Sequence, residues 1–175
     1  MRNKLVFIFG IGAWLFIAAC KDNTEGSKLT DFVKDAGNRL TQKAEVSGNK
    51  VVSQFVPDKP EEGKGSDVYR FIITVQSSPE KTTDSILYFF NYKSAGYFRM
   101  VTGTDTLHPV LSERMANGRE DLHQFTVLFD RSGITGTSDS LEIIFLGNKL
   151  FADSLFFRYA LTDIKNATKT LYGYE

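Results

Sequence analysis

The chain has 175 residues, with 21 basic and 21 acidic side chains and a formal net charge of zero. A balanced charge without a basic stripe argues against nucleic-acid binding and against polybasic attachment to anionic membranes. The single cysteine excludes an intramolecular disulfide. Stability must therefore come from an apolar core, to which 15 Phe and 7 Tyr residues can contribute.

The N-terminus has the organisation of a secretory signal peptide. Arg2 and Lys4 form a basic start, an apolar run covers residues 5–17, and small residues at 18–19 precede Cys20. This arrangement resembles the lipobox of a bacterial lipoprotein precursor, the substrate of signal peptidase II. The resemblance implies a diacylglycerol on the thiol of Cys20, cleavage in front of it, and acylation of the new N-terminus, for example with palmitate.

The alternatives are an uncleaved anchor and a transmembrane helix, but the 15 apolar residues at 5–19 fall short of the roughly 20 needed to span a bilayer. Stable anchoring needs at least two acyl chains. Lys21 stands where an aspartate would retain a Gram-negative lipoprotein in the inner membrane. The resemblance therefore implies a lipid anchor in the outer membrane, facing the periplasm or the surface. The pair at 21–22 also resembles the surface-export signals of Bacteroidota lipoproteins, from which Asn23 departs.

The mature chain has the length of one ordinary domain. Loss of the signal peptide, residues 1–19, removes two of the 21 basic residues and leaves 19 against 21 acidic ones. We expect a lipidated tether over 20–27, an amphipathic helix over 28–45 that packs on the domain, and a β-sandwich domain over 46–175. The helix is indicated by apolar residues at helical spacing: Leu29, Phe32, Val33, Ala36, Leu40 and Ala44.

Most of the remaining chain alternates between apolar and polar residues with period two, as strands do. The clearest alternating segments are 69–75, 86–92, 125–129, 141–145 and 155–161. Weaker candidates are 50–56, 97–102 and 107–112. A loop rich in Pro and Gly covers 57–66. Seven to eight strands joined by short polar turns predict a mainly β fold, an antiparallel β-sandwich of immunoglobulin- or transthyretin-like type.

Two patterns bear on metal binding. The dipeptide Asp-Ser precedes three predicted strands, at 84–85, 139–140 and 153–154. Its carboxylates would suit calcium, but no EF-hand-like spacing occurs, and Asp and Ser also favour turns. We interpret them as turn residues and predict no cofactor.

The two histidines offer the other metal hypothesis. His108 and His123 lie on either side of an Asn-Gly hairpin signal at 117–118. A hairpin would bring them together, with Glu113 or Glu120 as a further zinc ligand. The simpler interpretation, which we adopt, is two surface histidines and no metal.

The sequence holds no pattern typical of a known catalytic motif. It has no P-loop, no dinucleotide fingerprint and no Gly-x-Ser-x-Gly elbow, and lipidation of Cys20 leaves no free thiol. Acidic pairs at 61–62 and 120–121 lack an obvious apolar pocket that would raise one pKa. We interpret both pairs as solvated charge and predict that the protein is not an enzyme.

Residues 112–121 form the candidate binding segment, because loops on a rigid scaffold often carry recognition and Arg is favoured at interface hot spots. The alternative is an ordinary charged hairpin tip. The C-terminal tail is a second candidate, since its tyrosines would stack on a sugar or a partner, or else close the last strand. The candidate residues are Glu113, Arg114, Met115, Arg119, Glu120, Tyr172 and Tyr174.

These features favour a lipid-anchored, non-enzymatic binding or assembly component of a larger envelope complex, with a protein partner. In architecture it would be similar to small lipoproteins of secretion-system membrane complexes. One alternative is a surface lipoprotein that binds a glycan or small ligand, and another is an inhibitor or immunity-type protein that blocks an envelope hydrolase. Clustered exposed aromatics would favour the glycan, and a flat apolar patch would favour a protein. The aromatics in question are Tyr97, Phe98, Tyr172 and Tyr174.

Overall fold

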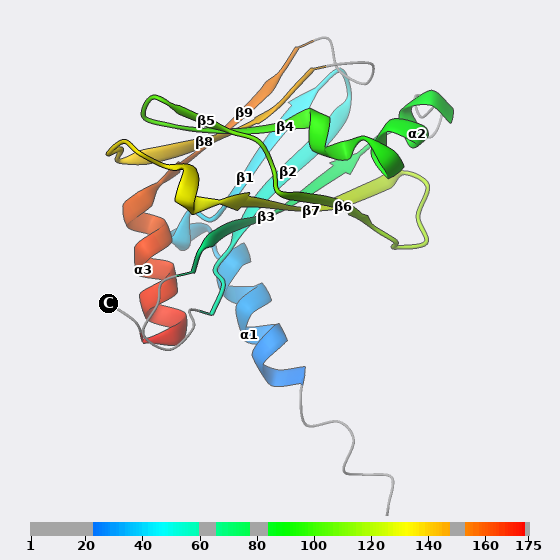
Figure 1. The fold of residues 1–175 in the computed structure, drawn as a ribbon. Coiled ribbons are helices and arrows are strands. Elements are labelled where there is room, and N and C mark those ends of the chain that lie inside the picture. Colours follow the sequence, from blue (N-terminus) through cyan, green and yellow to red (C-terminus); the bar gives the residue numbers. More distant parts are fainter. Residues whose placement is uncertain (1–22, 60–65, 78–83, 148–152, 174–175) are drawn as a thin grey trace, which may run out of the picture.

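The computed structural model describes residues 23–59, 66–77, 84–147 and 153–173. Within these ranges nine strands form two antiparallel sheets, ordered β1-β2-β3-β7-β6 and β5-β4-β8-β9 (Figure 1). The strands are β1 (Thr41–Val46), β2 (Asn49–Val56), β3 (Val68–Gln76), β4 (Phe98–Thr102), β5 (Asp105–Leu107), β6 (Leu111–Met115), β7 (Leu122–Asp130), β8 (Ser140–Phe145) and β9 (Leu155–Ala160).

The two sheets pack face to face because each presents apolar side chains at alternate positions. The ring of Phe71 in β3 lies 5.3 Å from that of Tyr159 in β9. The rings of Phe98 in β4 and Phe125 in β7 lie 5.7 Å apart. The buried Tyr159 hydroxyl hydrogen-bonds to Ser53 Oγ in β2, at 2.7 Å. The prediction of a mainly β fold with two antiparallel sheets is confirmed.

In the part of the chain that the structure describes, three α-helices accompany the sheets: α1 (Asn23–Lys34), α2 (Asp84–Tyr92) and α3 (Leu161–Tyr172). Short 3-10 helices are η1 (Ala36–Asn38), η3 (Ser94–Tyr97) and η4 (Arg131–Gly133). In Figure 1, α1 and α3 lie below the sheets, whereas α2 lies beside the β6–β7 hairpin. No helix in the described ranges is both long and apolar enough to cross a membrane.

The predicted helix over 28–45 is wrong in its second half. Helix α1 ends at Lys34, and Arg39 adopts a left-handed conformation with φ of 53° after η1. Residues 41–46 then pair with β2, so that Thr41 lies opposite Gln54. The available hydrogen-bond ladder of β2 outweighs the helical spacing of the apolar residues. Residues 23–27, expected in the tether, begin α1, and Cys20 lies outside the described residues.

Residues 86–92 form no strand, contrary to the prediction, because they lie in α2. Ile86 and Phe90, four residues apart, are buried, whereas Tyr88 and Tyr92 are exposed. This run is apolar at nearly every position, so its local pattern fits either a strand or a helix. The helix places the ring of Phe90 in the core, 5.0 Å from the ring of Phe125.

The strand count and the C-terminal element also differ from the prediction. The predicted strand over 107–112 is replaced by two strands, β5 and β6, and β1 adds another. The strand predicted over 155–161 stops at Ala160, where α3 begins. Helix α3 ends at Tyr172 and is capped by Gly173, whose φ of 72° suits glycine because the left-handed region is strained for other residues.

Candidate functional site

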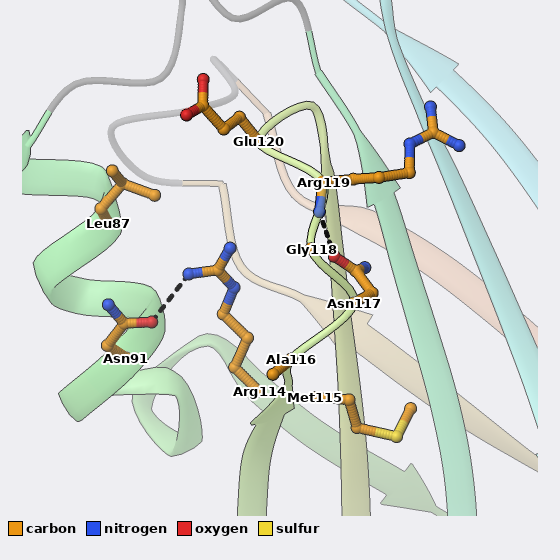
Figure 2. A pocket seen from close by; sticks show the side chains of 9 residues that line it. All are labelled: Leu87, Asn91, Arg114, Met115, Ala116, Asn117, Gly118, Arg119 and Glu120. Atoms are coloured by element: carbon orange, nitrogen blue, oxygen red, sulfur yellow. Dashed lines mark hydrogen bonds between the residues drawn. The ribbon is translucent and has the colours of Figure 1, made fainter.

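A pocket of about 490 Å³ lies between α2 and the turn that connects β6 to β7 (Figure 2). The end of β6 and the turn, residues 114–120, supply seven of its lining residues, and α2 supplies Leu87 and Asn91. The structure thus places most of the predicted binding segment, 112–121, at a concave site. The contribution from α2 was missed, because residues 86–92 were expected to be a strand.

The Asn-Gly pair shapes the turn, as its hairpin signal predicts. The Nδ2 of Asn117 donates to the carbonyl of Leu122 at 2.9 Å, and its Oδ1 accepts the backbone N–H of Arg119 at 3.1 Å. Gly118 has a φ of 69°, a conformation that glycine adopts without strain. These bonds define the loop that carries the lining side chains.

Arg114 faces α2 from the inner side of the sheet, since it pairs with the buried Phe125 across the β6–β7 ladder. Its Nη1 donates to the Oδ1 of Asn91 at 2.8 Å (Figure 2). Its Nε is buried and has no hydrogen-bond partner among the described residues. Within the same ranges no carboxylate forms a salt bridge with Arg114. The guanidinium is therefore only partly satisfied by its surroundings.

Arg119 has a different environment. Its Nε and Nη2 donate to the two carboxylate oxygens of Asp121, at 3.0 and 2.6 Å. This bidentate bond lowers the pKa of the Asp121 carboxyl from its ordinary value. The side chain extends away from Leu87 and Asn91 in Figure 2. Arg119 therefore lines the pocket, but its guanidinium is paired within its own loop and extends away from α2.

The other predicted binding residues of this segment do not form one cluster. Glu113 and Met115 pair with Thr126 and Gln124, on the outer face of the sheet, opposite to Arg114. Figure 2 shows the Met115 side chain directed away from Arg114, whereas Glu120 extends from the loop on the side of α2.

His123 lies behind Arg114 in the core. It is fully buried, its ring lies 5.0 Å from that of Phe90 at an interplanar angle of 55°, and neither ring nitrogen has a hydrogen-bond partner among the described residues. Burial lowers the pKa of His123 to about 4, the positive charge of Arg114 adds to this, and Asp121 acts in the opposite direction. His123 is therefore neutral at pH 7, and its prediction as a surface histidine is wrong.

The structure separates the two histidines that a zinc site would require. His108 is exposed and precedes β6, where Leu111 pairs with Leu128. Leu128 is five residues from His123 along β7, or about 17 Å at about 3.4 Å per residue. The described residues contain no group of three or more His, Cys, Asp or Glu that could hold a metal ion.

The Asp-Ser dipeptides occupy different settings. Asp84 begins α2 rather than a strand, whereas Asp139 and Asp153 precede β8 and β9. Ser154 Oγ accepts the backbone N–H of Gly147 at 3.0 Å. Of the two acidic pairs, 61–62 lies outside the described residues, and in the other Asp121 bonds to Arg119.

The C-terminal candidates lie elsewhere. Tyr172 is half-buried in the last turn of α3 and donates to the carbonyl of Pro57 at 3.1 Å. That bond attaches α3 to the segment that follows β2. Tyr174 lies outside the described residues. Tyr97 and Phe98 are buried, so neither offers a surface for stacking.

Two exposed tyrosines next to the pocket were missed. Tyr88 and Tyr92 on α2 are 53% and 72% exposed, and their rings lie 5.3 Å apart. Each directly follows a lining residue of the pocket, Leu87 or Asn91. The four-residue spacing of the tyrosines was the signal that would have placed them on one helical face.

Known proteins provide no guide to this site. No protein-family model matches the chain, and comparisons with curated proteins and with solved structures give no significant match. The function therefore has to be argued from the residues of the site.

Proposed function

We propose that this protein is a lipid-anchored, non-enzymatic binding or assembly component of a larger complex at the outer membrane of a Gram-negative cell. The binding surface consists of α2 and residues 114–120. The observation that carries this proposal is the pocket with Arg114 on its wall, where a guanidinium bonds to a neutral amide instead of a carboxylate. Arginines that are partly desolvated in this way are typical interface hot spots.

Other features support binding rather than catalysis. The volume of about 490 Å³ falls within the roughly 300–1,000 Å³ of ligand sites. His123, the histidine behind Arg114, is fully buried. A ligand in the pocket therefore cannot exchange a proton with it. A lipid at Cys20 would hold the site near the membrane and raise its effective concentration towards other envelope components.

The anchor can be tested at Cys20. We expect Cys20→Ala to accumulate as an unprocessed precursor, because the diacylglycerol is attached to the thiol before cleavage. Mass spectrometry of the membrane fraction would measure this, with wild-type protein as the reference. A mature, lipidated form of the variant would contradict the lipobox interpretation.

The partner can be tested by crosslinking in intact cells, followed by purification and mass spectrometry. We expect a stoichiometric envelope protein with the wild type and at least a tenfold lower yield with Arg114→Gln, the change expected for loss of about 1.4 kcal/mol of binding free energy. Arg70→Gln is the matched control, since Arg70 lies on β3, outside this surface, and is paired with Asp58. A partner that both variants retain would contradict the proposed surface, and the absence of any partner would favour the second candidate.

That second candidate is a lipoprotein that binds a glycan or small ligand. The exposed pair Tyr88 and Tyr92, directly beside the pocket, favours it. Tyrosine offers a large, rigid apolar face with a polar end, which suits a ligand that is half apolar and half hydroxylated. A screen of soluble sugars and small acids against the purified protein would distinguish this function from protein binding.

A further inference from the structure

We propose that the pocket between α2 and residues 114–120 binds the carboxylate group of a small organic ligand, and that Arg114 holds this group. The inference rests on the second candidate function above, small-ligand binding, and specifies its chemistry.

The hydrogen-bond donors of Arg114 are not used up. A guanidinium has five N–H donors. One on Nη1 bonds to Asn91, and the one on Nε is covered by protein without a partner among the described residues. The remaining donors lie on the two Nη nitrogens, at the end of the side chain that Figure 2 shows between α2 and the loop. A carboxylate can accept two parallel bonds from that edge.

The chain itself supplies carboxylates to two other arginines. Arg119, five residues away, has both oxygens of Asp121, and Arg70 lies 2.9 Å from Asp58. Arg114 has only the neutral amide of Asn91 in the described part of the chain. A partly buried cation without a counter-charge is unfavourable, so an anion that enters the pocket supplies a counter-charge that the described residues do not.

The charges around the pocket favour a monoanion over a doubly charged group such as phosphate. The charge of Arg119 is balanced by Asp121, and Glu120 adds a negative charge to the lining. His123 behind the pocket contributes no second cation at pH 7, as its burial keeps it neutral. Desolvation of a dianion costs far more than desolvation of a monoanion, and one positive charge close to a negative one offsets little of that cost.

The lining also indicates an organic ligand rather than a bare ion. The pocket of about 490 Å³ is large compared with one carboxylate and includes the side chain of Leu87. The same helix, α2, also carries the exposed aromatic rings of Tyr88 and Tyr92, although neither lines the pocket. Two ligand types of suitable size share the carboxylate: an acidic sugar and an acylated amino acid.

The test is calorimetric titration of the purified full-length protein in detergent with D-galacturonate and with N-acetyl-L-phenylalanine. Each probe is compared with its primary amide, which has the same shape and no charge. We expect at least one carboxylate to bind, with an affinity about tenfold or more above that of its amide. Which probe binds distinguishes an acidic sugar from an acylated amino acid. This comparison uses the wild type and does not depend on any variant folding.

Variants then locate the binding group. Arg114→Gln is expected to weaken carboxylate binding at least tenfold, and Arg114→Lys less, since a lysine retains the charge but not the planar pair of donors. Glu120→Gln is expected to strengthen binding about two- to threefold by removing a repulsion. Arg70→Gln, the matched control outside the pocket, should change it less than about twofold.

The proposal is overturned if neither carboxylate binds at about 10 mM, if the amides bind as well as the acids, or if Arg70→Gln weakens binding as much as Arg114→Gln. These outcomes can be distinguished from failure of the proposed role as a component of an envelope complex. If crosslinking still gives a protein partner that Arg114→Gln loses, the binding surface stands and its ligand is a protein. If both experiments are negative, the surface itself is refuted.

Discussion

Replacement of Phe125 by alanine is expected to lower the free energy of unfolding by about 3–5 kcal/mol, the range for large aromatic residues in a core. Its ring is fully buried and lies 5.0 Å from that of Phe90 in α2 and 5.7 Å from that of Phe98 in β4. One side chain thus joins both sheets and the helix. Urea unfolding followed by circular dichroism would measure the change.

The same substitution should also impair the candidate site. Phe90 attaches α2 to the core, and α2 carries Leu87 and Asn91 into the pocket. A cavity at residue 125 removes packing that positions the helix, so the bond between Asn91 and Arg114 should weaken before the sheets unfold. We therefore expect ligand or partner binding to fall in conditions where Phe125→Ala is still folded.

Thr126→Ala is the control, because Thr126 lies on the same strand but on the outer face. It should change the free energy of unfolding by less than about 1 kcal/mol. A loss of less than about 1.5 kcal/mol for Phe125→Ala would contradict the close packing described for this residue.

The second large effect is expected from acid. His123 has a pKa of about 4 in the folded protein, against 6.5 as its ordinary value. Below pH 6.5 the unfolded chain binds a proton at this residue that the folded protein does not. The contribution of neutral His123 to the free energy of unfolding is therefore complete above pH 6.5 and is lost as the pH falls towards 4. Linkage over that interval amounts to about 3 kcal/mol.

The measurement is urea unfolding at several pH values between 7 and 4, compared with His123→Leu. The variant should lose much less stability over this interval, because leucine does not titrate. Carboxyl groups such as Asp121 also titrate in acid, but they are present in both proteins and largely cancel in the difference. His108→Leu, at an exposed site, should behave like the wild type. Equal pH dependence of wild type and His123→Leu would show that His123 does not titrate in this way.

The same residue illustrates the limits of local patterns. His123 stands next to a charged turn in the sequence, which suggested exposure. In the structure its place in β7 decides its burial, because it shares the inner face with Phe125 and α2 covers it. The covering helix is more than thirty residues away in the chain, so no local pattern could reveal it.

Much of the fold was determined by the sequence itself. Strict alternation with one buried face predicted strands in β3, β7 and β8, and from them a mainly β fold with antiparallel sheets. The Asn-Gly pair predicted the β6–β7 hairpin, since its backbone preference is local. The segment 112–121 was also recognised as a candidate site from its charged loop.

Tertiary structure decided the rest. Residues 41–46 form a strand because they pair with the free edge of β2. Residues 84–92 form a helix because that conformation places their apolar side against the core. The site arises only from that outcome: Arg114 meets Asn91 across 23 residues of sequence. Alternation along a strand is a local property and can be read from the chain. The packing of one apolar face against another is set by contacts between segments that are distant in the sequence. Those contacts also form the pocket.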